Sequence, residues 1–473
     1  MENKRGSFSG SLGFVLAAAG SAVGLGNIWR FPYLAAKDGG GIFILTYIIL
    51  ALTFGFALLT TEIAIGRKTG KSPLVAYGIL NPKWKWIGPL ACLVPMLILP
   101  YYCVIGGWIL KYLATYLTGH GADAVADGYF TGFITSQVSP IVWFLIFLAA
   151  TAVVILIGVD KGIERLSRVL MPCLVLLVLI IGIFSVTRSF TDPATGETRT
   201  GLQGLAVYLI PNFEGFTFAK FCNVLMDAMG QLFYSISVAM GIMITYGSYV
   251  KKEINLGKSV NHIEIFDTAV ALLAGMMIIP AVFTFMGRDG LSAAGPSLMF
   301  VSLPKVFDAM GGLGAFVAVI FFVMVVFAAL TSSVSIMEAI TSCFMDQFKL
   351  SRRTAGCITF ALTLILGLVV CLGYNVFYFE LTLPNGSVAQ VLDVMDYLSN
   401  YILMPIVAIA TCILVGWVSK PKWVIDEVTV NGESFARRPL YVVMVKFVTP
   451  VLLVFLLLQS LGLFHWIASL FAA

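Results

Sequence analysis

Long apolar stretches constrain this 473-residue sequence more than any other feature. Eleven of them are long enough to cross a lipid bilayer as helices, and they lie at 12–35, 41–66, 87–117, 141–158, 166–186, 218–248, 264–286, 313–343, 354–374, 388–416 and 440–468. Hydrophobic residues make up 59% of the chain and charged residues only 11%, which is too little charge to cover a soluble surface. The sequence therefore predicts an all-α polytopic membrane protein with eleven transmembrane helices.

The basic residues between these stretches are distributed unevenly. If the N-terminus lies inside, the inner connecting segments hold twenty lysines and arginines and the outer ones hold five. Such an excess is typical of cytoplasmic loops. We therefore expect a plasma (inner) membrane protein with a cytoplasmic N-terminus, and the odd number of helices predicts an extracellular C-terminus. The N-terminal residues MENKRGSFSGSLGF are expected to lead into the first helix rather than into a cleavable signal peptide.

Several other classes of protein are disfavoured. The eight cysteines are scattered singly without a CxxC pair, which argues against a disulfide framework and against a zinc site. No run of lysines and arginines indicates a nucleic-acid partner. The three histidines (His120, His262 and His465) form no HExxH motif or nucleophile constellation, so we do not expect an enzyme.

Glycines and polar residues interrupt the first and the sixth of the apolar stretches. The first contains GSAVGLGN at 20–27, and the sixth contains GQLFYSISVAMG at 230–241. Glycine weakens a helix, and non-helical backbone is tolerated within a membrane only where protein or a water-filled cavity surrounds it. Close packing between helices is an alternative interpretation of the small residues in the first stretch.

The two interruptions occupy matching positions if the chain consists of two inverted halves. These halves would be 12–186 and 218–416, within a single transmembrane domain at 1–473 that ends with an extra helix at 440–468. Broken helices at matching positions indicate a binding site between the halves. The third and eighth stretches also match, and their middles carry the hydroxyl groups of Tyr101, Tyr102, Thr331, Ser332, Ser333 and Ser335.

An unwound helix offers ligands for a zwitterion and for a small cation. The freed N–H groups at one half-helix attract a carboxylate, and the freed carbonyls, with hydroxyl and amide oxygens, coordinate a hard cation such as Na⁺. Neutral oxygens suit a monovalent ion better than the carboxylate-rich shells that are typical of calcium. The pattern therefore fits a binding site for a zwitterion and a small cation.

Several motifs resemble one known family. GSAVGLGNIWRFPY is similar to the first-helix signature of the neurotransmitter:sodium symporters, which include bacterial leucine-transporter-like proteins, and PYYCVIGGW, GQLFYSIS, LTSSVSIME and LDVMDY resemble the third, sixth, eighth and tenth helices of that family. The resemblance runs in order from about residue 5 to about residue 400. It implies a fold of five plus five inverted helices, with helices one and six broken, and sodium-coupled amino-acid import by alternating access.

The resemblance also implies the residues of the binding sites. One sodium ion would be held with the substrate's carboxylate by Ala22, Asn27, Ser235 and Asp267. A second sodium ion would be held by Gly20, Val23, Ala328, Thr331 and Ser332. The hydroxyl of Tyr102 would hold the substrate's carboxylate, in a site formed by Ser21, Ala22, Gly26, Tyr102, Tyr234, Ser235, Ser237, Met240, Ser332 and Ile336.

Two gates are implied in the same way. Arg30 and Asp396 would close the outer side; alternatively, they are charges at helix ends that extend to the membrane surface. Arg5 and Asp346 would close the inner side, supported by Tyr249. Glu62, which lies within an apolar stretch, is expected to satisfy backbone groups of the broken helix rather than to bind ligand.

Three local features refine the predicted function. By the same resemblance, Tyr47, Gln231 and Ser235 match the residue types of the chloride site in chloride-dependent members, whereas Asp267 stands where those members have an asparagine. Its fixed carboxylate could replace the anion, so we expect chloride independence. Tyr234 and Met240 in the side-chain pocket favour a hydrophobic or aromatic amino acid, because methionine adapts to different shapes. Gly162 and Pro172 permit local unwinding that could open a water path to the second sodium, and an ordinary helix start is the alternative.

Two other functions remain open at this stage. A passive facilitator or channel would need a continuous polar path, whereas the polar groups cluster at one depth. A transporter-like amino-acid sensor would bind the same substrate without moving it. The expected partners are accordingly an amino acid, sodium ions and the lipid bilayer.

Overall fold

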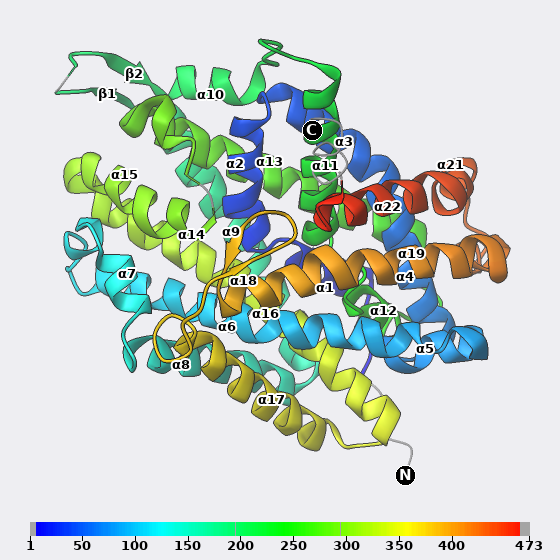
Figure 1. Ribbon diagram of the computed structural model, residues 1–473. Helices are drawn as coiled ribbons and strands as arrows, with labels where there is room; N and C mark the ends of the chain where they lie inside the picture. The colour runs from blue at the N-terminus through cyan, green and yellow to red at the C-terminus, as the bar shows by residue number, and fades with distance from the viewer. Residues whose placement is uncertain (1–5, 194, 294, 464–473) are drawn as a thin grey trace.

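The computed structural model describes residues 6–193, 195–293 and 295–463. The strands in these residues form two short antiparallel hairpins, β1 (Ser189–Thr191) with β2 (Thr198–Thr200) and β3 (Leu381–Thr382) with β4 (Val388–Ala389). Both hairpins lie in connecting segments that the sequence places on the outer side. The remaining elements are helices (Figure 1).

The longer helices carry most of the apolar stretches. Several of them are joined end to end by short π-helical turns, so that α3 and α4 form one span, as do α18 and α19. The helices of nine residues or more are α1 (Ser11–Ala22), α3 (Gly41–Leu50), α4 (Phe56–Thr69), α6 (Ile87–Leu117), α8 (Ser139–Ile157), α9 (Arg165–Val186), α10 (Gly201–Leu209), α11 (Phe218–Ser235), α13 (Leu256–Gly290), α16 (Gly314–Phe348), α17 (Arg352–Leu372), α19 (Met404–Ile413) and α22 (Thr449–Ser460).

Shorter helices connect or complete these spans. Some lie in the loops, and others continue a span beyond a break or a π-helical turn. They are α2 (Phe31–Lys37), α5 (Pro73–Leu80), α7 (Tyr129–Ile134), α12 (Ile242–Gly247), α14 (Gly295–Ser297), α15 (Leu303–Ala309), α18 (Val391–Asp396), α20 (Lys422–Val428) and α21 (Arg438–Val443).

The number of membrane-spanning helices agrees with the prediction only in part. Within the described residues, nine helices are long and apolar enough to cross a membrane, or ten if the bent pair Ser11–Ala22 and Gly26–Lys37 counts as one span. The predicted sixth span, 218–248, is divided between α11 and α12. The last predicted span, 440–468, extends beyond the described residues. The count of eleven therefore stays a prediction.

The first apolar stretch is interrupted where its glycines lie. Helix α1 ends at Ala22, Val23 is extended, and the chain resumes as a π-helical turn at Gly26, with a bend of 55° between the two parts. A Cβ atom on Gly24 would lie 2.8 Å from the Ser332 hydroxyl, and one on Gly26 would lie 3.0 Å from the Tyr234 ring. Glycine is therefore favoured at these positions, because a larger residue would force the neighbouring side chains to shift.

The sixth apolar stretch is interrupted in a different way. Between α11 and α12, Ser237 and Ala239 have φ angles of 55° and 60°, a region that L-residues other than glycine rarely adopt. The Ala239 N–H donates a hydrogen bond of 2.6 Å to the Glu62 carboxyl, which reaches it from α4. The expectation that Glu62 satisfies backbone groups of a broken helix is confirmed, since this segment has no helical hydrogen bonds of its own there.

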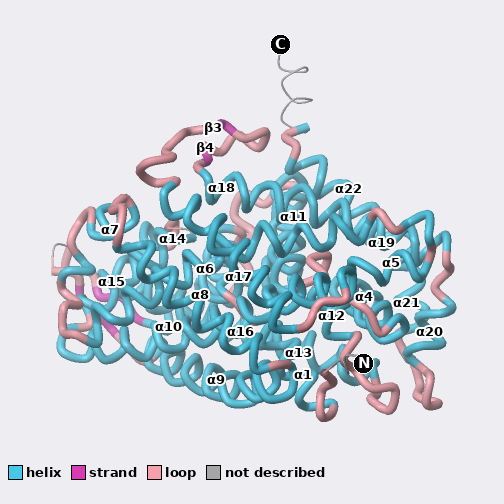
Figure 2. The backbone as a smooth tube through the Cα atoms, turned by 90° about the horizontal axis from the view of Figure 1, so that it is seen from below, coloured by secondary structure: helices cyan, strands magenta, loops and turns pink. Residues whose placement is uncertain are grey.

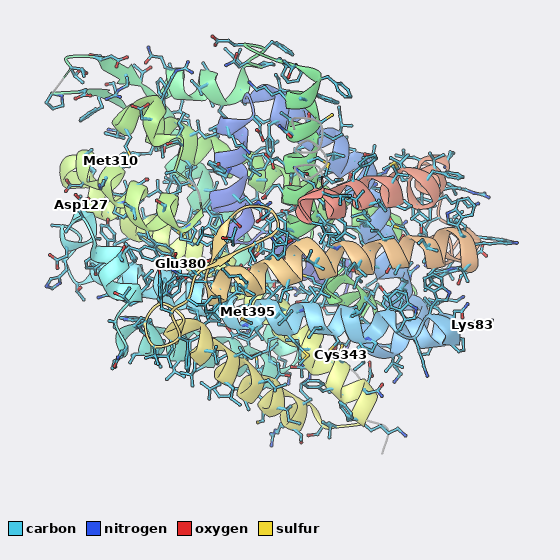
Figure 3. All side chains as sticks on the ribbon, viewed as in Figure 1. Lys83, Asp127, Met310, Cys343, Glu380 and Met395 are labelled. Atoms are coloured by element: carbon cyan, nitrogen blue, oxygen red, sulfur yellow. The ribbon has the colours of Figure 1, made fainter. Side chains whose placement is uncertain are left out.

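The interrupted stretches lie inside a bundle of longer helices. Helix α6 packs along α16 and α8, and α1 packs against α13, α16 and α9. Figure 1 shows α6 and α19 side by side across the middle of the molecule, and Figure 2 shows α9 and α13 on the face opposite β3 and β4. Lys83 and Asp127, which the sequence places on the inner and the outer side, lie at opposite ends of the bundle in Figure 3.

Candidate functional site

The two breaks enclose a cavity of about 340 Å³. Every residue that was predicted to contact the substrate lines it, namely Ser21, Ala22, Gly26, Tyr102, Tyr234, Ser235, Ser237, Met240, Ser332 and Ile336. The cavity is also lined by Ile98, which the sequence analysis missed. Ile98 lies on α6 one turn before Tyr102, so the helical spacing from that tyrosine could have identified it.

Hydroxyl groups connect the walls of the cavity across the two breaks. The Leu25 N–H points to the Tyr102 hydroxyl at 3.5 Å. The Ser21 hydroxyl donates to the Ser237 hydroxyl at 3.1 Å, and the Ser237 hydroxyl is 3.1 Å from the Ser21 carbonyl. One end of the cavity thus presents N–H and O–H donors, which suits a carboxylate. The remainder is lined by Ile98, Met240 and Ile336, which suits an apolar side chain.

A cluster of oxygen atoms lies directly beside this cavity. The Asn27 amide donates to Asp267 at 2.9 Å, and the Ser235 hydroxyl lies 2.8 Å from Asp267 and 3.2 Å from the Asn27 carbonyl oxygen. All three side chains are buried, and the partners found for Asp267 in the described part of the chain are neutral. A buried carboxylate with neutral partners favours a nearby cation. Asn27, Ser235 and Asp267, three of the four residues predicted for the first sodium site, therefore lie together.

A second group of oxygens lies at the end of α1. The Ser332 hydroxyl on α16 is 3.4 Å from the carbonyl oxygens of both Gly20 and Val23. On the same helix, the Thr331 hydroxyl is 3.1 Å from the Ala328 carbonyl. Each of these oxygens is neutral, as expected of ligands for a monovalent cation. Among the groups predicted for the second sodium site, the Ser332 hydroxyl thus lies near the Gly20 and Val23 carbonyls, and the Thr331 hydroxyl lies near the Ala328 carbonyl.

The predicted outer gate borders a second cavity, of about 700 Å³, which shares Tyr234 with the first. Arg30 lines this cavity, and its guanidinium group lies 5.8 Å from the centre of the Tyr401 ring. Asp396 accepts hydrogen bonds from Tyr101 at 3.0 Å and from Asn400 at 2.6 Å. In the residues that the structure describes, no ion pair joins Arg30 to Asp396, so their closure of the site stays a prediction.

The predicted inner gate is described only in part, because Arg5 lies outside the described residues. Asp346 accepts a hydrogen bond of 2.7 Å from the Ser72 N–H and lies 3.4 Å from the Lys71 ammonium group. The Tyr249 hydroxyl donates to Glu338 at 2.5 Å, and its carbonyl accepts a bond of 3.2 Å from Phe8 N–H. Tyr249 thus joins the chain before α1 to α16.

Glu338 and Arg352 form an ion pair that the sequence analysis missed. Both guanidinium nitrogens of Arg352 bond the fully buried Glu338 carboxylate at 2.7 Å. The signal was present in the sequence, because Glu338 is a charge inside the eighth apolar stretch, where an unpaired charge is expensive. Its partner could not be named from spacing, since Arg352 lies fourteen residues further along, beyond the end of α16.

Comparisons with known proteins now identify relatives along nearly the whole chain. The model of the Sodium:neurotransmitter symporter family matches residues 5–125 and 134–468. This chain belongs to that family. An uncharacterised sodium-dependent transporter of Bacillus subtilis is 32% identical over 472 residues, which cover 98% of this chain and 99% of the relative. The human sodium- and chloride-dependent GABA transporter 2 is 26% identical over 478 residues, covering 90% and 75% respectively.

A solved structure supports the same assignment. The crystal structure of MhsT in complex with L-phenylalanine matches with a TM-score of 0.83 and 33% identity, over 96% of this chain and 100% of that chain. The family resemblance predicted from the motifs is confirmed. The family consists of sodium-dependent symporters rather than enzymes, and membership together with the apolar helices makes this chain a multi-pass membrane protein with sodium as the coupled ion.

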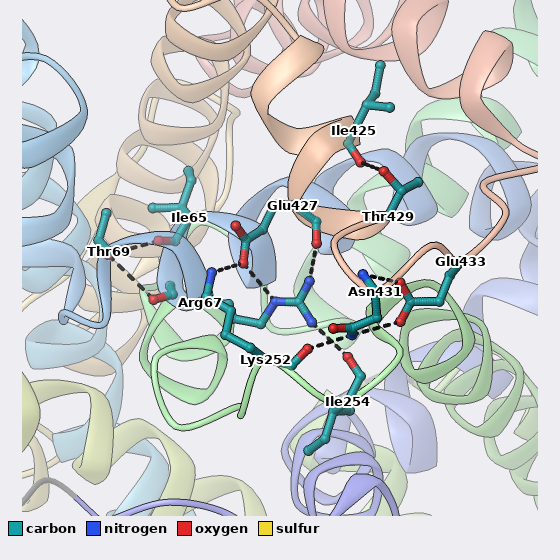
Figure 4. Close-up of polar contacts among 11 residues, drawn as sticks. Ile65, Arg67, Thr69, Lys252, Ile254, Ile425, Glu427, Thr429, Asn431 and Glu433 are labelled. Carbon is teal, nitrogen blue, oxygen red and sulfur yellow. Dashed lines mark hydrogen bonds and ion pairs between the residues drawn. The ribbon is translucent and has the colours of Figure 1, made fainter.

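In this symporter, further ion pairs hold the end that the sequence predicts to be inner. The Arg67 guanidinium, at the end of α4, donates to the Glu427 carboxylate on α20 at 2.9 Å and to the Ile254 carbonyl at 2.7 Å (Figure 4). Arg67 and Glu427 are both buried, and Lys252 pairs with the same carboxylate. Three segments far apart in the sequence are thereby fixed to one another. The sequence analysis counted Arg67 only as an inner basic residue.

The start of α9 is linked to the chain that precedes α1. A π-helical turn, Val159–Glu164, contains Gly162, and its buried Glu164 accepts a hydrogen bond of 2.9 Å from the Ser9 N–H. Arg168, one turn later, bonds the same carboxylate at 2.6 Å. Gly162 thus lies in a hydrogen-bonded π-helical turn in this structure, and both local unwinding there and a water path to the second sodium site stay predictions.

Proposed function

We propose that this chain imports a hydrophobic or aromatic amino acid together with sodium, independently of chloride, by alternating access. One observation carries the proposal: the cavity between the two breaks is lined by all the predicted substrate residues, and an oxygen cluster with a buried carboxylate lies beside it. The cluster and the cavity share Asn27 and Ser235. Sodium and substrate would therefore bind as neighbours, and each would favour binding of the other.

Coupling between the two would arise from differential affinity. Asn27, Ser235 and Asp267 come from three separate elements, so a cation held among them would join the two breaks to α13. The substrate's carboxylate would complete the shell of that cation, and the Tyr102 hydroxyl would hold its second oxygen. The substrate then binds better to the sodium-loaded state, and downhill sodium entry drives uptake.

The lining of the cavity supports the proposed substrate class. Ile98, Met240 and Ile336 provide apolar contacts, and Tyr234 adds an aromatic face. A flexible methionine accommodates side chains of different shape. The similar protein MhsT was crystallised with L-phenylalanine, which is a ligand of this kind.

The surroundings of Asp267 support chloride independence. The Tyr47 hydroxyl lies 3.4 Å from one oxygen of Asp267, and the Ser235 hydroxyl lies 2.8 Å from the other. The residue types of a chloride site thus face a fixed carboxylate that supplies the negative charge. Uptake should be unchanged when gluconate replaces chloride, and a collapse of uptake would overturn this part of the proposal.

The wider architecture belongs to the same proposal. The inverted halves 12–186 and 218–416, the extra helix at 440–468, the eleven crossings and the extracellular C-terminus together provide alternating access. Arg30 with Asp396 and Arg5 with Asp346 would close the two sides in turn, and Tyr249 would support the inner pair. The matching positions of the two breaks support this arrangement.

The test is a competition panel with the purified protein in liposomes. Each of the twenty amino acids competes with a labelled substrate whose uptake is driven by an inward sodium gradient. We expect hydrophobic or aromatic amino acids to compete best, and we expect no uptake when choline replaces sodium. Uptake without sodium would favour a passive facilitator, and binding without uptake would favour an amino-acid sensor.

A further inference from the structure

A buried carboxyl group without a hydrogen-bond donor lies at the outer end of the first broken helix. Asp38 follows the last residue of α2, and its N–H caps that helix by bonding the Leu34 carbonyl at 2.9 Å. The Asp38 side chain is only 5% exposed, and its Oδ2 atom has no hydrogen-bond partner. A buried polar atom of this kind is rare in proteins and requires a specific explanation.

The neighbour of this carboxyl group is a second one. Asp227, on α11, is placed beside Asp38 by its ion pair with Lys37, the residue before Asp38, and its negative charge opposes ionisation of the Asp38 carboxyl. The Lys37 ammonium group bonds the Asp227 carboxylate at 2.7 Å. Lys220 on α11 is the other cation that acts on Asp38, and the Tyr33 hydroxyl acts on Lys37.

The electrostatic surroundings place the titration of Asp38 in the neutral range. Burial, followed by the adjacent charge of Asp227, raises the pKa of the Asp38 carboxyl to about 7, while Lys37 and Lys220 oppose that rise. Asp38 therefore keeps its proton below about pH 7 and becomes negatively charged above it. The carboxyl pair carries one negative charge in the first state and two in the second.

This change in charge occurs beside the predicted outer gate. Asp227 lines the 700 Å³ cavity together with Arg30, and both Asp227 and Asp396 act electrostatically on that arginine. A second negative charge next to Asp227 strengthens its attraction for Arg30, and Arg30 is then drawn toward α11 and away from Asp396. Protonation of Asp38 weakens the attraction of Arg30 toward α11, so that Arg30 is attracted mainly by Asp396.

We propose that Asp38 and Asp227 form a proton-sharing pair that makes the outer gate respond to external pH. The pair with one proton favours closure of the 700 Å³ cavity, and the fully ionised pair favours its opening. The ligand of the site is a proton from the outer solution. The proposal rests on the alternating-access function proposed above, because it assumes that Arg30 and Asp396 close that cavity.

The experiment measures, in the full-length protein, the distance between the segment that precedes α11, which carries Asp227, and the segment that precedes α18, which carries Asp396. Spin labels are placed on cysteines introduced at Phe213 and Val388, which are 66% and 62% exposed, after the accessible native cysteines (Cys173, Cys222 and Cys357) are changed to serine. Distance distributions are recorded in proteoliposomes at pH 6 and pH 8. We expect the ratio of wide to narrow distances to rise about fivefold at the higher pH, which is a typical coupling between two sites.

Two variants and one matched control make the test specific. Asp38→Asn removes the titrating group with little change in shape, and it should give the narrow distribution at both pH values. Asp227→Asn removes the neighbouring charge while leaving Asp38 buried, so the transition should move to lower pH. Asp127→Asn neutralises an outer carboxylate that is 92% exposed and lies elsewhere, and it should leave the pH response intact.

The outcomes separate this proposal from the proposed function. A wild-type distribution that is independent of pH, or a pH response that persists in Asp38→Asn, overturns the proton-sharing pair. Sodium-driven uptake at pH 7 is measured on the same preparations. Intact uptake without a pH response refutes the pair alone, whereas loss of sodium dependence in the wild type refutes the transport function.

Discussion

The two ends of the binding cavity are closed by different kinds of interaction. Outer and inner denote the sides that the basic residues predict. On the inner side, buried ion pairs join distant segments, with Arg352 bonded to Glu338 and Arg67 bonded to Glu427. On the outer side, the cavity next to Tyr234 has a volume of about 700 Å³, and Arg30 faces it without an ion pair to Asp396 among the described residues.

This difference indicates that the inner side costs more free energy to open than the outer side. Breaking a buried ion pair by removing one partner leaves an uncompensated charge and is strongly destabilising. The inner side is therefore fixed by interactions that resist opening, whereas on the outer side Asp396 accepts hydrogen bonds from the uncharged Tyr101 and Asn400 side chains rather than forming an ion pair among the described residues. In the proposed function, sodium and substrate would therefore need to rearrange only the outer side first.

The largest expected effect comes from the inner ion pair. Glu338→Gln removes the negative charge that faces Arg352, and we expect the free energy of unfolding to fall by about 3 kcal/mol. The change is measured as a lower midpoint of thermal unfolding in detergent. Because the pair also bonds Tyr249, cysteines on the inner side should become more reactive toward alkylating reagents.

The control for that variant is the neighbouring arginine. Arg353 is exposed and adjacent in sequence to Arg352, so Arg353→Ala removes one charge at the same place without disturbing a buried pair. We expect its unfolding midpoint to match that of the wild type. Equal destabilisation by both variants would contradict the special role of the buried pair.

The second prediction concerns the oxygen cluster between the two sides. Asn27→Ala removes the amide that bonds Asp267 and accepts from Ser235, and we expect sodium to support substrate binding at least tenfold more weakly, as is typical when a group that orients metal ligands is lost. The measurement is substrate binding as a function of sodium concentration. Unchanged sodium dependence would remove Asn27 from the first sodium site.

The sequence predicted the breaks and the lining of the cavity well. Polar and glycine residues are rare within apolar stretches, so GSAVGLGN and GQLFYSISVAMG each identified a stretch that contains a break, after Ala22 in the first and after Ser235 in the second. The family motifs supplied the expected residue roles. The same reasoning found Glu62, because a lone carboxylate inside an apolar stretch needs a partner.

The sequence could not reveal which residues far apart along the chain become partners in the folded protein. Arg67 and Glu427 are separated by 360 residues, and nothing in their local sequence indicates that they meet. The left-handed backbone at Ser237 and Ala239 was also missed, since neither residue type signals a positive φ angle. Ile98 was missed because it is an ordinary apolar residue in an apolar helix.

The third prediction tests the outer side. Arg30→Gln keeps a polar side chain and removes a charge that forms no ion pair with Asp396 in the described residues, so the free energy of unfolding should fall by less than about 1 kcal/mol. Sodium-driven uptake should nevertheless fall sharply if Arg30 closes the cavity during the cycle. Stability and uptake are measured on the same preparation. A stability loss as large as that of Glu338→Gln would contradict the contrast between the two sides.

The smallest expected effects come from two ion pairs that involve exposed lysines, one on each side of the molecule. Lys71 pairs with Asp346 on the inner side and Lys305 pairs with Asp127 on the outer side, and both lysines are about equally exposed, at 45% and 40%. Exposed ion pairs contribute about 0–1 kcal/mol because water screens them. We therefore expect Lys71→Ala and Lys305→Ala to shift the unfolding midpoint slightly and equally. The acidic partners differ, however, because Asp346 is 8% exposed and Asp127 is 92% exposed. A much larger effect of Lys71→Ala would therefore mean that burial of the carboxylate, rather than exposure of the lysine, sets the strength of such a pair.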